Sequence, residues 1–183
     1  MRINIKQNKI SLTSTYKVFI EGENKYLASA KLFRIFSEIP IIELSSNEIK
    51  LTIKKRFFLF KPKYDFYRGN EILTFRNIEF WRGHYQCIDS NSTYHIYANK
   101  GLKFSVFRNG IQIAKWYKND FAILAGDEYD IWANNNSDFE LIIAFCITID
   151  NHTSKNRNHS LFRVDLGRPG LVKKEFDTDW EPS

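Results

Sequence analysis

The chain has 183 residues, of which 43% are hydrophobic and 16% aromatic, and its formal net charge is +6. This length fits one domain whose core needs no disulfide or metal for stability, and the apolar content excludes extensive disorder. Because the 21 acidic residues are interspersed with the 27 basic ones, the charge permits contact with phosphate groups but does not require it.

The first nine residues contain no continuous apolar stretch. They do not have the pattern of a signal peptide, so we expect the protein in the cytoplasm. The two cysteines, Cys87 and Cys146, lack the C-x-x-C spacing of zinc and redox motifs. Cys146 lies in an apolar stretch and fits a small core residue. A disulfide between the two cysteines stays open as the less favoured alternative.

Alternation of apolar and polar residues dominates the chain as far as Trp132. This period of two predicts β-strands. A loose unit of strand, polar turn and strand begins at positions 16, 64, 85, 104 and 129. Asn109-Gly110 is a strong hairpin signal, because both residues tolerate a positive φ. The irregular spacing predicts a meander of antiparallel hairpins that forms a sandwich or barrel, not a solenoid or propeller.

The most apolar stretch, residues 139–149, follows a possible capping box. In that motif Ser137 and Glu140 exchange hydrogen bonds with each other's backbone, and Asp138 suits the positive end of a helix. The β-branched residues of the stretch favour a long buried strand instead, but the capping box favours a helix. We therefore predict a helix over about residues 138–150 that is buried on every side. Its length of roughly 20 Å is too short to cross a bilayer.

Residues 151–160 are polar and basic and predict a loop, and residues 161–166 have the pattern of one further strand. The domain is therefore expected to span residues 1–166. Residues 167–183 form a C-terminal tail that mixes lysines with four acidic residues. We expect this tail to be mobile or loosely docked.

This order of elements resembles the tubby C-terminal fold family, which includes the plant LURP-one-related proteins and the phospholipid scramblases. The resemblance covers roughly residues 16–150. It rests on the long meander, the closing segment 126–132, a polar break and the apolar stretch. It implies a mainly β fold, a closed antiparallel barrel of about twelve strands around one central hydrophobic helix near the C-terminus. Such a helix fills the lumen and leaves function to the outer surface or the barrel ends.

The resemblance also implies candidate functions. Tubby domains bind phosphoinositides through basic side chains, scramblases are linked to calcium and lipid, and many LURP-one-related proteins have no assigned activity. The lipid-binding residues of tubby domains do not align one by one with this sequence, so none is carried over. Asp127, Glu128 and Asp130 are too few for the alternating ligands of a calcium loop. Strand-start and turn positions explain these three residues better than an acid–base set does.

Motifs of common enzyme classes are missing from the sequence: it has no GxGxxG, P-loop, G-x-S-x-G or HExxH. The four histidines are scattered without metal-ligand spacing, at His84, His95, His152 and His159. We therefore expect a protein that is not an enzyme and that needs neither a metal nor another cofactor.

The best candidate site is the segment 50–63, in which six of 14 residues are basic and residues 57–60 are apolar. Cations beside aromatic rings suit an anionic membrane surface, and they also suit single-stranded nucleic acid. The alternative is an ordinary hairpin with a solvated basic face and residues 57–60 in the core. The expected ligand-binding residues are Lys54, Lys55, Arg56, Lys61 and Lys63.

Our first hypothesis is a non-enzymatic module that binds anionic phospholipid headgroups at the periphery of a membrane through this segment. The second is a structural or protein-interaction module without a small ligand, in which aromatic residues such as Trp81, Trp116 and Tyr117 supply the interface. A nucleic-acid partner is not expected, and the sequence does not indicate an oligomeric state.

Overall fold

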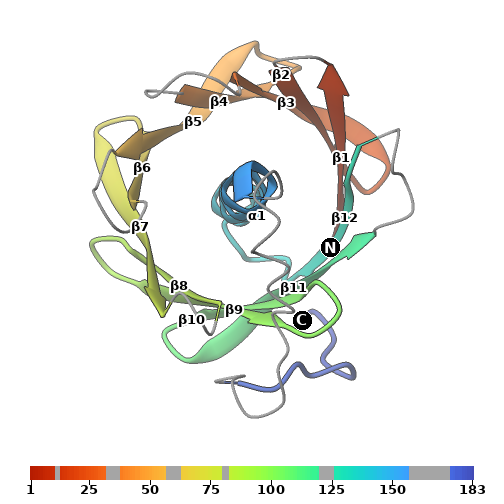
Figure 1. Ribbon diagram of the computed structural model, residues 1–183, viewed down its shortest axis with the longest axis vertical. Coiled ribbons are helices and arrows are strands. Elements are labelled where there is room, and N and C mark those ends of the chain that lie inside the picture. Colours follow the sequence, from red (N-terminus) through yellow and green to blue (C-terminus); the bar gives the residue numbers. More distant parts are fainter. Residues whose placement is uncertain (11–12, 32–37, 57–62, 80–82, 120–125, 157–173) are drawn as a thin grey trace.

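The computed structural model describes residues 1–10, 13–31, 38–56, 63–79, 83–119, 126–156 and 174–183. It confirms the predicted fold, a closed barrel of twelve antiparallel strands around one helix (Figure 1). Each strand pairs with its neighbours in the sequence, and β12 pairs with β1 to close the barrel. The elements are β1 (Arg2–Ile10), β2 (Thr13–Ile20), β3 (Glu23–Lys31), β4 (Glu38–Glu43), β5 (Glu48–Arg56), β6 (Lys63–Arg68), β7 (Glu71–Glu79), β8 (His84–Ile88), β9 (Thr93–Asn99), β10 (Lys103–Arg108), β11 (Ile111–Asn119), β12 (Glu128–Ala133) and α1 (Phe139–Asn156).

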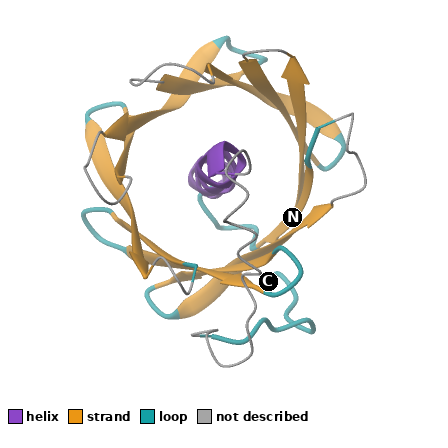
Figure 2. Ribbon diagram, viewed as in Figure 1, coloured by secondary structure: helices purple, strands orange, loops and turns teal. Residues whose placement is uncertain are grey.

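The strand connections alternate between the two ends of the barrel, because consecutive strands are antiparallel. We name the end where α1 begins the start rim and the opposite end the far rim. The start rim carries the hairpin turns that precede β3, β5, β7, β9 and β11, and the far rim is the end at which β5 stops and β6 begins. Figure 2 shows the helix inside the ring of strands.

The turn between β10 and β11 confirms the hairpin predicted from Asn109-Gly110. Asn109 has a φ of 50° and Gly110 a φ of 87°. Both angles belong to the left-handed region that two-residue hairpin turns require, and glycine and asparagine tolerate this region best.

The core lies inside the barrel, between the wall and α1. Inward-facing strand residues alternate with outward-facing ones, and residues 141–149 of α1 are all buried, with at most 3% of each exposed. Phe145 packs near the middle of this core, with its ring 5.7 Å from that of Phe75 and 6.0 Å from that of Phe66. The helix has no polar face along this stretch because the wall surrounds it on all sides.

The capping box predicted at the start of the helix, between Ser137 and Glu140, is wrong. The backbone N–H of Leu141 donates to Oδ1 of Asp138 at 3.1 Å, so Asp138 is the capping residue. Glu140 accepts a hydrogen bond from the hydroxyl of Tyr26 on the wall at 2.8 Å, and Ser137 lies one position too far from the first turn. The capping box therefore does not form, because the side chain of Glu140 accepts a hydrogen bond from Tyr26 of the barrel wall instead.

The predicted end of the helix near residue 150 is also wrong, since α1 continues to Asn156, which lies within the expected loop 151–160. Cys87 and Cys146 are both buried and free, so the disulfide alternative is excluded. The strand expected at 161–166, the apolar run 57–60 and Lys61 lie outside the described residues.

Candidate functional site

The basic residues of the candidate segment gather at the far rim, at the end of β5 and the beginning of β6. Leu51 and Ile53 are buried and face inward. Lys55 continues this inward series, whereas Lys54 and Arg56 belong to the alternate positions on the outer face. The expected ligand-binding residues therefore divide between two faces of the wall.

Two of these cations are paired with carboxylates. Lys54 lies 2.8 Å from Glu38, and its ammonium stands 4.8 Å from the centre of the Tyr67 ring. Arg56 pairs with Asp65, a residue on the outer face that is only 1% exposed. The Lys54 pair is exposed on both sides and contributes at most about 1 kcal/mol, so it can be exchanged for another anion at low cost. The Arg56 pair has a buried partner and is part of the structure of the wall.

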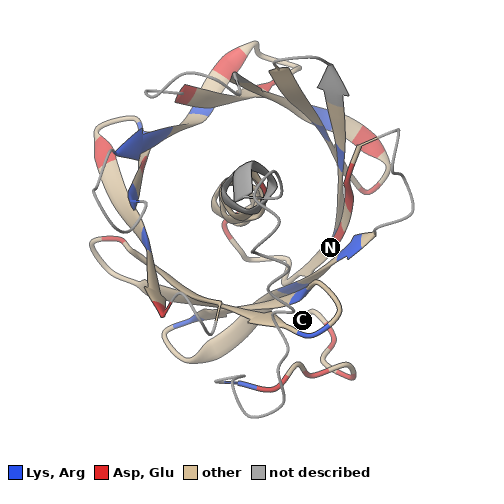
Figure 3. Ribbon diagram, viewed as in Figure 1, with Lys and Arg blue, Asp and Glu red and all other residues tan. Residues whose placement is uncertain are grey.

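Three basic residues form a row across neighbouring strands. Arg56 of β5 is opposite Lys63 of β6, and Lys63 is opposite Arg76 of β7. All three occupy outward-facing positions, because the adjacent Ile53, Tyr64 and Phe75 series is buried. Residues directly opposite in a sheet have Cβ atoms about 5 Å apart. We call these three residues the basic row; Figure 3 shows Lys and Arg gathered on this part of the wall.

Arg76 also links the basic row to β8. Its guanidinium donates two hydrogen bonds to Oε1 of Gln86, at 3.1 Å and 2.7 Å. The bonds hold the side chain along the wall with a planar cation at the surface, the form in which arginine binds phosphate. The sequence analysis missed Arg76, because it lies 13 positions beyond Lys63 and only the pairing of β6 with β7 makes them neighbours.

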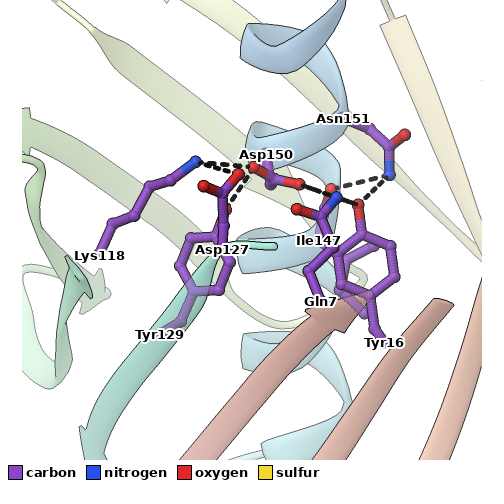
Figure 4. Close-up of polar contacts among 8 residues, drawn as sticks. All are labelled: Gln7, Tyr16, Lys118, Asp127, Tyr129, Ile147, Asp150 and Asn151. Atoms are coloured by element: carbon purple, nitrogen blue, oxygen red, sulfur yellow. Dashed lines mark hydrogen bonds and ion pairs between the residues drawn. The ribbon is translucent and has the colours of Figure 1, made fainter. Parts of the chain in front are cut away.

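A second polar group lies inside the barrel at the far rim (Figure 4). The carboxylate of Asp150, on α1, accepts hydrogen bonds from Nε2 of Gln7 at 2.9 Å, from the hydroxyl of Tyr16 at 2.9 Å and from the hydroxyl of Tyr129. It also pairs with the ammonium of Lys118 at 3.1 Å. We call Asp150 and these four donors, which come from β1, β2, β11 and β12, the Asp150 cluster.

The Asp150 cluster extends to two more residues. Lys118 also pairs with Asp127 at 2.7 Å, so its ammonium bridges two carboxylates. Asn151 donates to the Tyr16 hydroxyl at 3.0 Å and to the backbone carbonyl of Ile147 at 3.3 Å. Since these side chains are almost fully buried, their mutual hydrogen bonds replace the water that each would otherwise bind.

The environment of Asp150 changes the acidity of its neighbours. Burial and the adjacent carboxylate raise the pKa of the Tyr16 phenol well above its ordinary value, and the same two causes raise the pKa of Tyr129. Burial, with Asp150 one turn away, also raises the pKa of the Cys146 thiol. These groups therefore stay protonated at neutral pH, so the phenols act as hydrogen-bond donors and the thiol is a core residue.

The acidic residues 127, 128 and 130 do not form one site. Asp127 points to Lys118 inside the barrel, whereas Glu128 pairs with Lys6 at 3.3 Å and Asp130 with Arg2 at 3.3 Å on the outer face. The alternation of the strand separates them. Across the ranges that the structure describes, no group of three potential metal ligands is found. The side chains of His152 and His159 lie outside the described residues.

A comparison with protein families gives a match over most of this architecture. The model for LURP-one-related proteins matches residues 1–150, from the first residue of the chain to the carboxylate at the centre of the Asp150 cluster. The chain belongs to the LURP-one-related family. Searches of curated proteins and of solved structures found no match.

The match of this LURP-one-related domain ends within α1, so residues 174–183 lie beyond it. In the described part of the chain, α1 lacks the combination of length and apolarity that a membrane crossing requires. The Asp150 cluster was not foreseen from the sequence. The signals were an aspartate directly after a nine-residue helix stretch in which Thr148 is the one polar residue, and a lysine, Lys118, at an inward-facing strand position.

Proposed function

We propose that this LURP-one-related domain is a non-enzymatic module of the cytoplasm that binds anionic phospholipid headgroups at a membrane surface. The observation that carries the proposal is the basic row, Arg56, Lys63 and Arg76, with Lys54 beside it. Cations on adjacent strands are close enough to contact one phosphate group together. Lys55 is proposed to contribute at the same rim, as is Lys61 from the sequence that joins β5 to β6.

The interior of the barrel supports an external site. Residues 141–149 of α1 occupy the lumen and are buried against the wall. The polar groups inside the far rim bind one another around Asp150. A ligand is therefore expected on the outer face or at a rim, where the basic row lies. The apolar residues 57–60, which follow Arg56 in the sequence, are proposed to add hydrophobic contact with the bilayer.

The strength of the proposed contact can be bounded. A basic residue near an anionic membrane contributes about 1 kcal/mol. Replacing Lys54, Lys63 and Arg76 with glutamine should therefore weaken binding by about 3 kcal/mol, which is more than 100-fold. Arg56 is left in place, because its loss would leave the buried carboxylate of Asp65 without its cation.

The test is co-sedimentation with liposomes of phosphatidylcholine alone and with added phosphatidylserine or phosphoinositide. We expect pelleting only with the anionic lipids, and its loss in the triple glutamine variant. The matched control replaces three lysines of β1 to β3 with glutamine, namely Lys6, Lys17 and Lys25. It should bind normally. Negligible pelleting with every lipid would refute the proposal, and equal loss in both triple variants would show a charge effect without a site.

A second candidate is a protein-interaction module without a small ligand. The observation that favours it is a set of exposed aliphatic side chains at the start rim, Leu44, Ile49, Ile72, Ile88 and Ile111. Each lies at a hairpin end, and Ile111 is 71% exposed. Affinity capture with the native chain and with an Ile49→Ser, Ile72→Ser and Ile111→Ser variant tests it. Recovery of the same proteins by both would count against this surface.

A further inference from the structure

The segment 174–183 lies on the outer side of the wall, next to β10 and β11 (Figure 1). The ring of Phe176 meets the edge of the Tyr117 ring at 5.2 Å and 72°. The ammonium of Lys103 is 5.4 Å from the centre of each of these rings, so it holds the wall and the segment together. Lys174 stands 3.5 Å above the ring of Phe107.

Lys115 makes the most specific contact with this segment. It points outward from β11, yet only 5% of the residue is exposed. Its ammonium donates to the backbone carbonyl of Thr178 at 2.8 Å and to that of Trp180 at 2.6 Å, and it lies 5.9 Å from the Trp180 ring. A lysine on the wall thus binds the backbone and an aromatic side chain of the same segment.

The segment is attached mainly through side chains. In the described part of the chain, one backbone–backbone hydrogen bond joins it to the barrel, from the N–H of Asn135 to the carbonyl of Ser183 at 3.0 Å. The N–H of Ser183 also donates to Oδ1 of Asn134 at 2.9 Å. The strands by contrast are held by continuous ladders, so the segment can leave without breaking the barrel.

The covered surface of the wall contains lysines beside aromatic rings, and the segment that covers it is acidic. Lys103 lies opposite Tyr117, and Lys115 lies opposite Trp132, so the covered surface alternates cations with aromatic rings. The segment carries one lysine and four carboxylates, and its two aromatic residues, Phe176 and Trp180, are four positions apart. Lysine side chains beside aromatic rings suit an acidic chain with aromatic anchors.

We propose that the outer face of β10 to β12 is a peptide-binding surface and that residues 174–183 are its detachable intramolecular ligand. When the segment is released, the surface binds an extended acidic peptide of another protein with two aromatic residues four positions apart. The segment thereby controls access to the surface. This role is independent of the lipid-binding proposal, which concerns β5 to β7.

The contact of Lys115 is consistent with release. An ammonium is strongly hydrated, and the ammonium of Lys115 has exchanged water for two neutral carbonyls. The hydrogen bonds to these carbonyls offset little more than the free energy of hydration that the ammonium has lost. Attachment therefore depends largely on proximity, since a segment of the same chain competes at an effective concentration in the millimolar range. A free peptide of the same sequence must overcome that competition.

The experiment measures binding of a fluorescent synthetic peptide of residues 174–183 to the full chain by anisotropy. The native chain is compared with Phe176→Ala/Trp180→Ala, which weakens the intramolecular ligand and leaves the wall intact. We expect at least tenfold tighter binding to this variant than to the native chain. Adding Lys115→Glu to the variant should abolish binding, and a peptide of scrambled sequence should not bind.

Hydrogen exchange of the native chain provides a second measurement that needs no variant. We expect the amides of residues 174–183 to exchange much faster than those of β10 and β11. Protection equal to that of the strands would overturn the proposal, because the segment would then be a fixed part of the fold. Failure of the double variant to bind the peptide, or equal binding of the scrambled peptide, would overturn it as well.

Discussion

Lys118 of β11 and Asp150 of α1 form an ion pair of 3.1 Å inside the barrel, although they are 32 positions apart in the sequence. The pair connects the wall to a helix whose other contacts are mostly apolar and non-directional. Asp138 makes a comparable connection at the start of the helix, where it pairs with Arg68 of β6. Two charged contacts thus fix the position of α1 along the barrel axis.

Replacing Asp150 with asparagine should destabilise the protein strongly. The change keeps the size of the side chain but removes the charge on which Lys118, Tyr16 and Tyr129 converge. Removing the charge of one partner in a buried ion pair lowers the free energy of unfolding by about 3–5 kcal/mol. Urea unfolding measures the difference. The exposed Asp179→Asn is the control and should change stability by less than about 0.5 kcal/mol; equal effects of the two changes would contradict the assigned role.

Stability should fall as the pH rises above about 10, the ordinary pKa of a tyrosine. The pKa values of Tyr16 and Tyr129 are raised in the folded protein, so these phenols lose their protons first in the unfolded chain. The unfolded state then binds fewer protons, and the free energy of unfolding decreases by up to about 1.4 kcal/mol per pH unit for each group. Below pH 10 both states are protonated and the effect is absent.

The Tyr16→Phe and Tyr129→Phe variants isolate this effect. Each should be less stable than the native chain at neutral pH, because a donor to Asp150 is lost. Each should also show a shallower decline above pH 10, which chemical denaturation at several pH values measures. Identical slopes in the native chain and both variants would show that these phenols do not cause the decline.

Gly126→Ala should be far more damaging than Gly22→Ala, although both glycines have a positive φ. A Cβ atom at Gly126 would lie 1.8 Å from the carbonyl oxygen of Gln7, whereas nothing lies within 4 Å of one at Gly22. Gly22→Ala should cost about 1–2 kcal/mol through backbone strain alone. Gly126→Ala must also move the backbone of β1 beside the Asp150 cluster, so we expect at least twice that loss in urea unfolding.

Asp138→Ala should destabilise the protein by about 1–3 kcal/mol, because it removes both the helix cap and the partner of Arg68. Asp138→Asn keeps the capping oxygen and should cost less. Ser137→Ala should cost under about 0.5 kcal/mol, since its hydroxyl is 3.5 Å from the Ile113 carbonyl. A larger loss of stability for Ser137→Ala than for Asp138→Ala would support the capping box that was predicted from the sequence.

Local patterns were sufficient to predict antiparallel hairpins and a buried helix, and the family resemblance added their arrangement as a closed barrel around that helix. Each pattern follows from where its residues lie relative to the single core of the fold. This holds for the alternation along the strands, for the Asn109-Gly110 turn and for the apolar stretch 139–149. Together with the family resemblance they led to the closed barrel with a central helix. The cap was predicted one residue early, because the sequence does not show that Tyr26 of the wall binds Glu140.

The contacts that distinguish this barrel depend on residues far apart in the sequence. Only strand pairing places Arg76 beside Lys63 in the basic row, and only closure of the barrel brings Gln7 and Lys118 to Asp150. Apolar burial leaves a local periodic trace because it acts on every residue of an element. A hydrogen bond or ion pair involves single positions and leaves no such trace. The sequence by itself therefore determined the strands of the barrel and its buried helix. The tertiary structure decided which polar groups meet.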